Sequence, residues 1–322
     1  MKRLMIIVPC FNEQEVFENT LQQLSNLLFD LIKRQKIAEN SGILFVDDGS
    51  TDNTRQLITE AHQKYNHVYG VLLAANVGHQ NALVAGLEVA ADMCDVTITI
   101  DADLQDDIFV IEEMIDKFEG GCDIVYGVRS DRKTDSFLKR TTAELFYKFM
   151  NFLGVKMVNN HADFRLLSVR ATRQLLKYTE RNLFLRGIVT ELGYKTDCVY
   201  YKRQKRTAGK TKYSPRKMLK FAWEGITSFS IRPMKLIMAL GLVIMLCSFL
   251  ALCYVLASYF FRNAGSGWPS LMISIWFLGG VQLFSIGVVG QYIGKIYLET
   301  KHRPRYIISE RTWEPYERHY KG

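Results

Sequence analysis

The sequence predicts an α/β protein: a mostly parallel sheet domain, followed by an interfacial amphipathic helix and two transmembrane helices. The sheet is predicted because short apolar, β-branched runs alternate with helical patterns over roughly the first 125 residues. This alternation is typical of strands joined by right-handed helical crossovers. The membrane helices are predicted because residues 236–261 and 263–294 carry no charged side chain. Each segment exceeds the ~20 residues that span a bilayer.

Four runs near the N-terminus have the character of buried strands: RLMIIVP, GILFVDD, VYGVLLA and VTITID. Helical patterns separate and follow these runs, at residues 13–36, 52–65, 79–91 and 106–119. Ligands of such sheets bind beyond the carboxyl ends of the strands. Three of those ends carry polar side chains, in PCFNE, DDGSTD and DADLQD. The sequence therefore predicts one crevice built from three strand ends.

The acids of these strand ends predict a cation site. Asp101 and Asp103 are two positions apart after a buried strand, so on an extended strand end they point the same way. Two such carboxylates repel each other unless a cation lies between them. Oxygen ligands of this kind suit Mg²⁺ or Mn²⁺, which also bind substrate phosphates. Asp47 and Asp48 either accept hydrogen bonds from a sugar hydroxyl or a base N–H, or only cap the helix that follows them.

Length and composition allow one large domain or one domain with an accessory part. The chain has 322 residues, 48% of them hydrophobic, and a net charge of +8. This charge favours an anionic ligand or a membrane surface over an acidic protein partner. Basic runs interleaved with stacking aromatics are not obvious, so a nucleic-acid partner is not expected. The six cysteines are expected to be small buried hydrophobes in a reducing compartment.

The C-terminal half is expected to hold the membrane-associated parts. The predicted N-terminal catalytic domain comprises residues 1–213, and a juxtamembrane helix follows at 214–232. A region of two transmembrane helices at 233–294 has its spans near 236–261 and 269–293, and a basic tail follows at 295–322. The juxtamembrane helix either lies in the headgroup layer or is an ordinary surface helix. Because the tail is basic, the positive-inside tendency places the tail and the N-terminal domain in the cytoplasm. Five glycines in the second span suggest close packing within or between chains.

Seven motifs occur in order along the chain: VPCFNE, VDDGSTDNT, NVGHQNALVAGL, DADLQD, ADFRLLS, ERNLFLRG and RTAGKTKYS. Together with the two apolar segments, they resemble the polyprenyl-phosphate glycosyltransferases of family 2, which have the GT-A fold. The likeness is greatest to bactoprenol glucosyltransferases and more distant to dolichol-phosphate mannose synthase. It covers essentially the whole chain.

This resemblance implies a role for each motif. It implies a uridine pocket formed by Pro9, Phe11, Glu13 and Asp48, and a divalent-metal site formed by Asp101, Asp103 and Gln105. On the acceptor side it implies a motif with Asp163 and Arg165, and basic positions near the acceptor phosphate at Arg129 and Arg140. It also implies a loop that closes over the phosphates, with Arg206, Lys212 and Tyr213. Asp163 would be a base, or would only orient Arg165 in an ion pair. The alternative for the basic residues is a solvated face near acidic lipid headgroups. One turn departs from the family pattern: Ala75–His79 stands where Arg-Asn-Phe-Gly-Lys is common, so His79 receives no role.

The resemblance also implies the reaction. We expect inverting transfer of a sugar, most of all glucose, from a UDP-sugar to undecaprenyl phosphate with Mg²⁺ or Mn²⁺, at the cytoplasmic face of the cell membrane. The product would supply cell-surface glycan modification. A second phosphate pKa near ~6 leaves the acceptor largely dianionic, so a base is scarcely required. The alternatives are transfer of N-acetylglucosamine or another sugar, and a non-catalytic membrane scaffold. A homodimer or tetramer is a further hypothesis.

Overall fold

The computed structural model describes residues 1–130, 161–180, 185–202 and 268–313, together with scattered helical positions between 234 and 253. The chain divides into two compact units, which are described separately here: one comprises Met1–Lys148, Lys156–Ser214 and Pro304–Gly322, and the other comprises Phe149–Val155 and Pro215–Arg303.

The first unit is built on an eight-stranded sheet with the order β7-β5-β6-β4-β1-β2-β3-β8 among the described residues. Its strands are β1 Leu4–Cys10, β2 Gly42–Asp47, β3 Val68–Leu73, β4 Val96–Thr99, β5 Ile124–Arg129, β6 His161–Ser168, β7 Thr196–Tyr201 and β8 Ile308–Arg311. Strands β1 to β4 are mutually parallel, and β5 is parallel to β7. Only β6 and β8 run antiparallel to their neighbours in this described sheet. The predicted α/β class with a mostly parallel sheet is confirmed.

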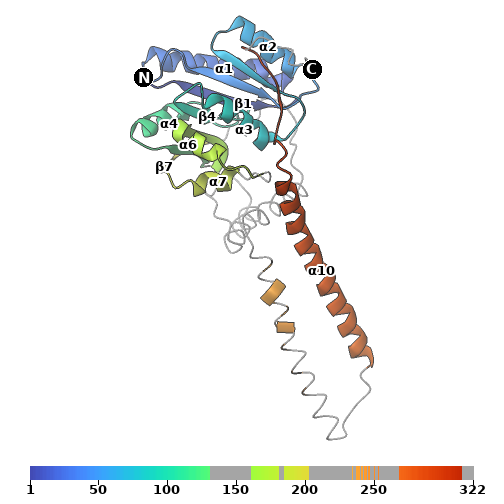
Figure 1. Ribbon diagram of the computed structural model, residues 1–322. Helices are drawn as coiled ribbons and strands as arrows, with labels where there is room; N and C mark the ends of the chain where they lie inside the picture. Colours follow the sequence, from blue (N-terminus) through green and yellow to red (C-terminus); the bar gives the residue numbers. More distant parts are fainter. Residues whose placement is uncertain are drawn as a thin grey trace. The chain divides into compact units, whose positions relative to one another are not determined.

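Helices cover both faces of this sheet (Figure 1). They are α1 Gln14–Lys33, α2 Thr54–Lys64, α3 His79–Ala90, α4 Val110–Glu119, α6 Val169–Leu176 and α7 Leu185–Glu191. Helices α1, α2 and α4 pack in one core with alternate β1 residues such as Leu4 and Ile6. Helix α3 packs on the opposite face, where a Cβ atom at Gly86 would lie 2.6 Å from a methyl carbon of Ile7. Because both faces are covered, every residue of β1 is buried, which explains its continuous apolar run.

The predicted basic tail, residues 295–322, contains a strand that the sequence did not indicate. Ile308–Arg311 forms β8, which pairs antiparallel with β3 as an edge strand of the sheet. Thr312 extends this pairing, because its N–H donates to the Gly70 carbonyl at 3.0 Å and its Oγ1 accepts from the Gly70 N–H at 2.9 Å. An edge strand of four residues is held mainly by backbone hydrogen bonds. It therefore leaves little hydrophobic pattern in the sequence.

The described part of the second unit contains the long helix α10, Trp268–Thr300, which covers the second predicted span at 269–293. Within the described residues, one helical stretch, Phe277–Thr300, is long and apolar enough to cross a membrane, with a mean hydropathy of 1.3. Of the first predicted span, only scattered positions between 234 and 253 are described, and these are helical. The predicted helix at 214–232 lies outside the described residues.

Candidate active site

The carboxyl ends of β1, β2 and β4 lie along one edge of the sheet, because these strands are neighbours and parallel. Hydrogen bonds join the loops that follow them. The Asn12 N–H donates to Ser50 Oγ at 3.0 Å, and the Glu13 N–H donates to Thr54 Oγ1 at 2.9 Å. Thr20 Oγ1 donates to the carbonyl of Ala102 in the third loop at 2.6 Å. The three polar segments therefore form one continuous rim.

The residues predicted to hold uridine occupy different environments on this rim. Pro9 is buried within β1, whereas the ring of Phe11 is exposed just beyond the end of the strand. Of these two residues, only Phe11 presents a ring that an incoming base could contact.

Asp48, also predicted to hold uridine, is buried and binds the turn that precedes α3. Its carboxylate accepts from the N–H groups of Val77 at 2.7 Å and Gly78 at 3.0 Å, and from Asn76 Nδ2 at 3.1 Å. Burial raises the pKa of Asp48, while the two backbone N–H groups act to lower it. Gly78 has φ +88°, a conformation that side chains with a Cβ rarely adopt. Asp48 thereby fixes the position of His79, the first residue of α3.

The loop that follows β4 carries the predicted metal ligands. The Asp101 side chain is 41% exposed, and its pKa is raised by desolvation and by the charges of Asp163, Asp106 and Asp103. Gln105 is buried and donates through Nε2 to Asp103 Oδ2 at 2.8 Å, so it holds Asp103 in place. Leu104 between them has φ +42°, an uncommon conformation for a side chain of this size.

This loop fits a cation bound together with a diphosphate. Within the described part of the chain, no three His, Cys, Asp or Glu side chains form a metal site by themselves. A divalent cation on Asp101 and Asp103 would therefore take its other ligands from phosphate oxygens and water, which is the habit of Mg²⁺. It would also relieve the repulsion that raises the pKa of Asp101.

His79 lies between the acidic loop and the next cluster, a role that the sequence did not assign to it. Its Nε2 is 3.5 Å from Asp101 Oδ1 and 3.6 Å from Asp163 Oδ2. Burial lowers the pKa of His79, but the neighbouring carboxylates of Asp163 and Asp101 outweigh burial and raise it overall. One signal in the sequence was available: the family resemblance implies a Lys at this position, so His79 marks a departure from the pattern.

Asp163 on β6 is the centre of a second cluster, formed with Arg165 and Arg186. Its Oδ1 accepts from Arg165 Nη2 at 2.6 Å and from Arg186 Nε at 3.2 Å, and its Oδ2 accepts from Arg186 Nη2 at 3.1 Å. Burial acts to raise the pKa of Asp163, but Arg186, His79 and Arg165 hold it well below its usual range. This carboxylate is therefore an ion-pair partner, which is the structural alternative to the base that the resemblance implies. Arg186 lies in the ERNLFLRG motif but was not singled out from the sequence.

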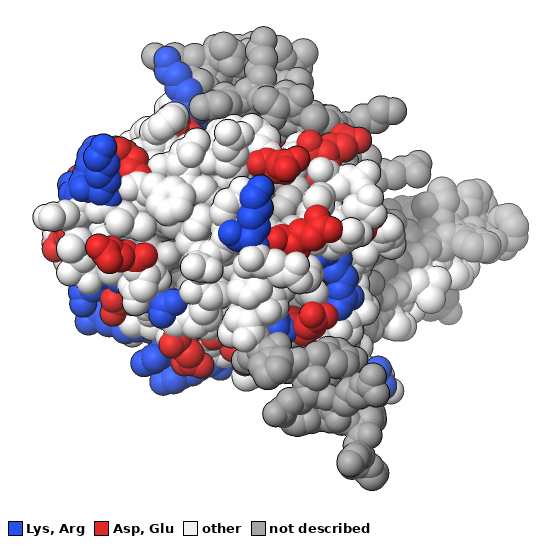
Figure 2. Space-filling model, turned by 90° about the horizontal axis from the view of Figure 1, so that it is seen from above, with Lys and Arg blue, Asp and Glu red and all other residues white. Residues whose placement is uncertain are grey.

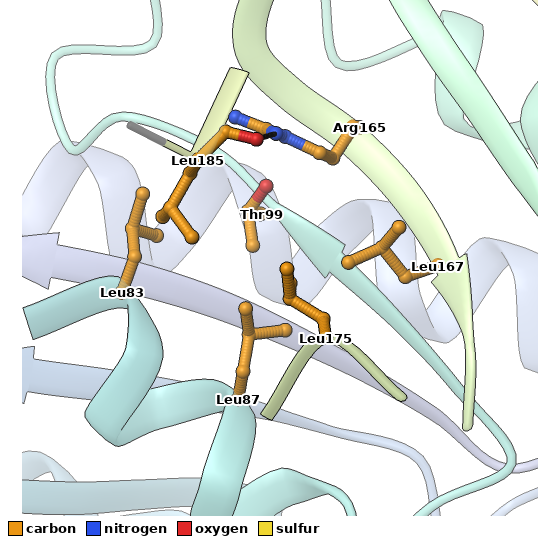
Figure 3. Close-up of a pocket in the computed structure, with 7 residues that line it drawn as sticks. All are labelled: Leu83, Leu87, Thr99, Arg165, Leu167, Leu175 and Leu185. Carbon is orange, nitrogen blue, oxygen red and sulfur yellow. Dashed lines mark hydrogen bonds between the residues drawn. The ribbon is translucent and has the colours of Figure 1, made fainter. Parts of the chain in front are cut away.

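Arg165 is an internal brace. Its side chain is only 3% exposed, and its Nη1 donates to the Leu185 carbonyl at 3.5 Å, as Figure 3 shows. The small cavity beneath its guanidinium is lined by Leu83, Leu87, Leu167, Leu175 and Leu185, with Thr99. In these contacts the Arg165 guanidinium faces the protein interior, so it is not a solvated surface residue.

Arg129 is also held by a carboxylate. Asp106, the last acid of the DADLQD motif, accepts at Oδ1 from Arg129 Nε at 3.0 Å and Nη2 at 2.8 Å, and from the Tyr201 hydroxyl at 2.7 Å. Burial and the Asp106 charge raise the pKa of Tyr201. The sequence analysis assigned no role to Asp106 or Tyr201, although Asp106 is the last residue of the DADLQD motif. Arg140, Arg206, Lys212 and Tyr213 lie outside the described residues.

The described surface does not form one basic field on the face drawn in Figure 2. Lys and Arg side chains are interspersed there with Asp and Glu side chains. In the site, the described arginines are paired with specific carboxylates: Arg129 with Asp106, and Arg165 and Arg186 with Asp163.

An α/β sheet with a cation-fitting acidic loop beside paired arginines is typical of enzymes that bind phosphorylated ligands at their strand ends. Residues 5–176 match the model of Glycosyl transferase family 2, and the chain belongs to this family of GT-A-like glycosyltransferase enzymes. An uncharacterized glycosyltransferase of Bacillus subtilis, YkoT, is 53% identical over 305 residues, 95% of this chain and 90% of that protein. A bactoprenol glucosyl transferase of Shigella phage SfV is 42% identical over 311 residues, 95% of this chain and 98% of that protein. A prophage bactoprenol glucosyl transferase homolog of Escherichia coli shows the same identity and coverage.

Proposed function

We propose that this enzyme transfers a sugar, most of all glucose, from a UDP-sugar to undecaprenyl phosphate at the cytoplasmic face of the cell membrane. One observation carries the proposal: an acidic loop that suits a cation and a diphosphate lies beside arginine clusters that suit a second anion. His79 joins the two, at 3.5 Å from Asp101 and 3.6 Å from Asp163. Similarity over nearly the whole length of bactoprenol glucosyl transferases supports the choice of acceptor and sugar.

The reaction joins two anions, and the residues of the crevice are arranged for that task. An oxygen of the acceptor phosphate forms a bond to the anomeric carbon while the bond from that carbon to the diphosphate breaks. The electron pair leaves with UDP, and the configuration inverts. A divalent cation on Asp101 and Asp103, Mg²⁺ or Mn²⁺, would stabilise the charge that develops on UDP. Gln105 keeps Asp103 oriented for this role.

No protein base is needed in this scheme. A phosphate monoester with a second pKa near ~6 is largely dianionic in the cytoplasm. The low pKa of Asp163 fits the same scheme, because so weak a base would accept a proton poorly at neutral pH. The remaining task is to position the acceptor, and positioning alone can supply several orders of magnitude in rate.

The apolar helix α10 supports the membrane location. Its stretch Phe277–Thr300 is long enough to span a bilayer, and apolar side chains along it are exposed, among them Leu283 at 73%. A polyprenyl chain stays in the bilayer, so an enzyme anchored there meets its acceptor at headgroup height. The basic residues that follow this helix support a cytoplasmic location for its C-terminal end, by the positive-inside tendency.

The test is transfer of labelled sugar into lipid. Membranes containing the full chain are incubated with undecaprenyl phosphate, Mn²⁺ and, separately, radiolabelled UDP-glucose, UDP-N-acetylglucosamine and UDP-galactose. We expect label in the lipid phase from UDP-glucose, reduced about 100-fold or more in Asp103→Ala because a metal ligand is lost. Asp92→Asn is the matched control, since Asp92 is 86% exposed on the surface. Label from UDP-N-acetylglucosamine alone would change the sugar, and absence of lipid label from every donor would contradict the proposal.

A further inference from the structure

The two arginines that bind Asp163 are not equivalent. The Arg165 side chain is 3% exposed, and its guanidinium donates hydrogen bonds to Asp163 and to the Leu185 carbonyl. Arg186 is 32% exposed. Its Nε and Nη2 form a bidentate pair with Asp163, and its Nη1 has no hydrogen-bond partner among the described residues. One guanidinium is therefore buried as a brace, and the other keeps an open edge.

The backbone that carries Arg186 is fixed from two sides. At the preceding residue, the Leu185 N–H donates to Gln80 Oε1 at 3.0 Å, and the Leu185 carbonyl accepts from Arg165 Nη1 at 3.5 Å. The carboxylate that orients Arg186 is fixed as well, because Thr99 Oγ1 donates to the Asp163 carbonyl. Side chains from α3, β4 and β6 thus hold this arginine in one orientation before any ligand arrives, which is how binding sites limit the entropy cost of binding.

We propose that Arg186 binds a phosphate group of a substrate through the guanidinium edge that Asp163 leaves open, and that Asp163 is a positioning residue for Arg186. The proposal rests on the proposed function for the identity of the phosphate, which belongs either to the donor diphosphate or to the lipid acceptor. Arginine suits this role because its planar fork binds phosphate oxygens in a fixed geometry.

The charges around Arg186 support this role. Asp101 and Asp163 act to raise the pKa of Arg186, so the guanidinium stays charged in a partly desolvated crevice. Asp163 accepts three hydrogen bonds from two guanidinium groups and has His79 as a further neighbour. A carboxylate engaged in this way orients cations, and its depressed pKa makes it a poor proton acceptor.

Binding to the full chain in detergent tests the proposal without requiring turnover. The dissociation constants of UDP with Mg²⁺ and of farnesyl phosphate are measured by calorimetry for the wild type, Arg186→Gln and Arg186→Lys. We expect one of the two ligands to bind about 10- to 100-fold more weakly to Arg186→Gln, the scale of losing hydrogen bonds between charged groups. The ligand affected identifies the phosphate. Arg173→Gln on α6 is the matched control, because Arg173 is a largely exposed arginine.

Arg186→Lys keeps the test decisive if Arg186→Gln does not fold. Because lysine keeps the charge but not the fork, we expect Arg186→Lys to fold and to bind the same ligand several-fold more weakly than the wild type. The proposal would be overturned if every Arg186 variant that folds bound both ligands with dissociation constants within twofold of those of the Arg173→Gln control. A wild type that binds UDP but labels no lipid from any donor would remove the proposed function, while the binding result for Arg186 would stand.

The role of Asp163 is tested by a double-mutant comparison in the transfer assay. If Asp163 acts through Arg186, then Asp163→Asn raises KM for the same substrate as Arg186→Gln, and the double variant is no worse than the more impaired single variant within about threefold. A double variant whose loss is the product of the two single losses would show that Asp163 acts independently, as a base would, and would overturn the positioning role.

Discussion

The acidic side of the crevice and its arginine side are built by the chain in different ways. The acidic side comes from one loop, Asp101–Asp106, in which Gln105 binds Asp103 two residues away. The arginine side is assembled from three elements, with Asp163 on β6, Arg186 on α7 and His79 on α3. A site made within one loop is visible as a motif, whereas a site made between elements depends on the fold that brings them together.

The antiparallel strand β6 explains how the second side reaches the first. It lies between β4 and β5, and Thr99 at the end of β4 is paired with Arg165 in the middle of β6, two residues after Asp163. The N-terminal end of an antiparallel strand lies at the same sheet edge as the carboxyl ends of its parallel neighbours. Asp163 therefore lies beside the acidic loop although 60 or so residues separate them.

The largest expected effect comes from removing the contacts that tie the acidic loop to the neighbouring strands β5 and β7. Asp106 belongs to the acidic loop, yet it binds Arg129 of β5 and Tyr201 of β7. Asp106→Ala leaves a partly buried guanidinium and a buried hydroxyl without this partner. We expect a loss of about 3 kcal/mol in the free energy of unfolding, measured by urea denaturation of the full chain in detergent. Asp107→Ala, in the next position, is the control, and equal stability of the two variants would show that the contacts of Asp106 with Arg129 and Tyr201 do not stabilise the fold.

A smaller effect is expected within the acidic loop itself. Gln105→Ala removes the hydrogen bond that orients Asp103 but leaves both carboxylates in place. Supporting residues of this kind typically contribute 10- to 100-fold to metal affinity. We therefore expect the Mn²⁺ concentration for half-maximal transfer to rise about 10-fold, with little change in the KM for the lipid acceptor. Gln56→Ala on α2 is the control. A raised KM for the lipid acceptor with an unchanged Mn²⁺ dependence would show that Gln105 supports acceptor binding instead of metal binding.

The difference between the two sides also explains what the sequence could predict. The parallel strands, their helices and the rim of three polar strand ends follow from hydrophobic periodicity and from turn residues, which are local properties of the chain. The sequence also left two readings of Asp48 open, and in the structure its carboxylate binds the turn before α3. That bond joins residues about 30 positions apart, so no local pattern could distinguish the readings.

The residues that sequence reasoning missed share one property: their roles depend on long-range contacts. His79 is a helix-start residue in the sequence, and only the fold places it between Asp101 and Asp163. Arg186 lies in ERNLFLRG and the predicted site residue Arg165 lies in ADFRLLS, and only their burial in the fold distinguishes the buried guanidinium of Arg165 from the partly exposed one of Arg186. Strand β8 was missed because four residues at a sheet edge carry too little pattern.

The smallest expected effect lies at the opposite end of the strands from the crevice, in a charged cluster around Asp123. Asp123, which precedes β5, accepts from Ser168 Oγ at 2.8 Å and pairs with Arg170. The Arg170 hydrogen bond is the main cause that lowers the pKa of Asp123, against a smaller opposing effect of burial. Because the folded-state pKa lies below the unfolded value of about 3.9, this stability is present above that value and is lost as pH falls through the folded pKa.

We therefore expect Asp123→Asn to be less stable than the wild type by about 1 kcal/mol at pH 7, with unchanged transfer activity per folded molecule. The difference in the free energy of unfolding between the two proteins should be the same at pH 6 and should decrease below about pH 4, as the wild-type carboxylate is protonated. Urea denaturation at each pH measures it, with the exposed Asp92→Asn as the control. A gap that widened in acid would contradict the assignment of the lowered pKa. A loss of transfer activity would mean that this end of β5, far along the strand from Arg129, also shapes the crevice.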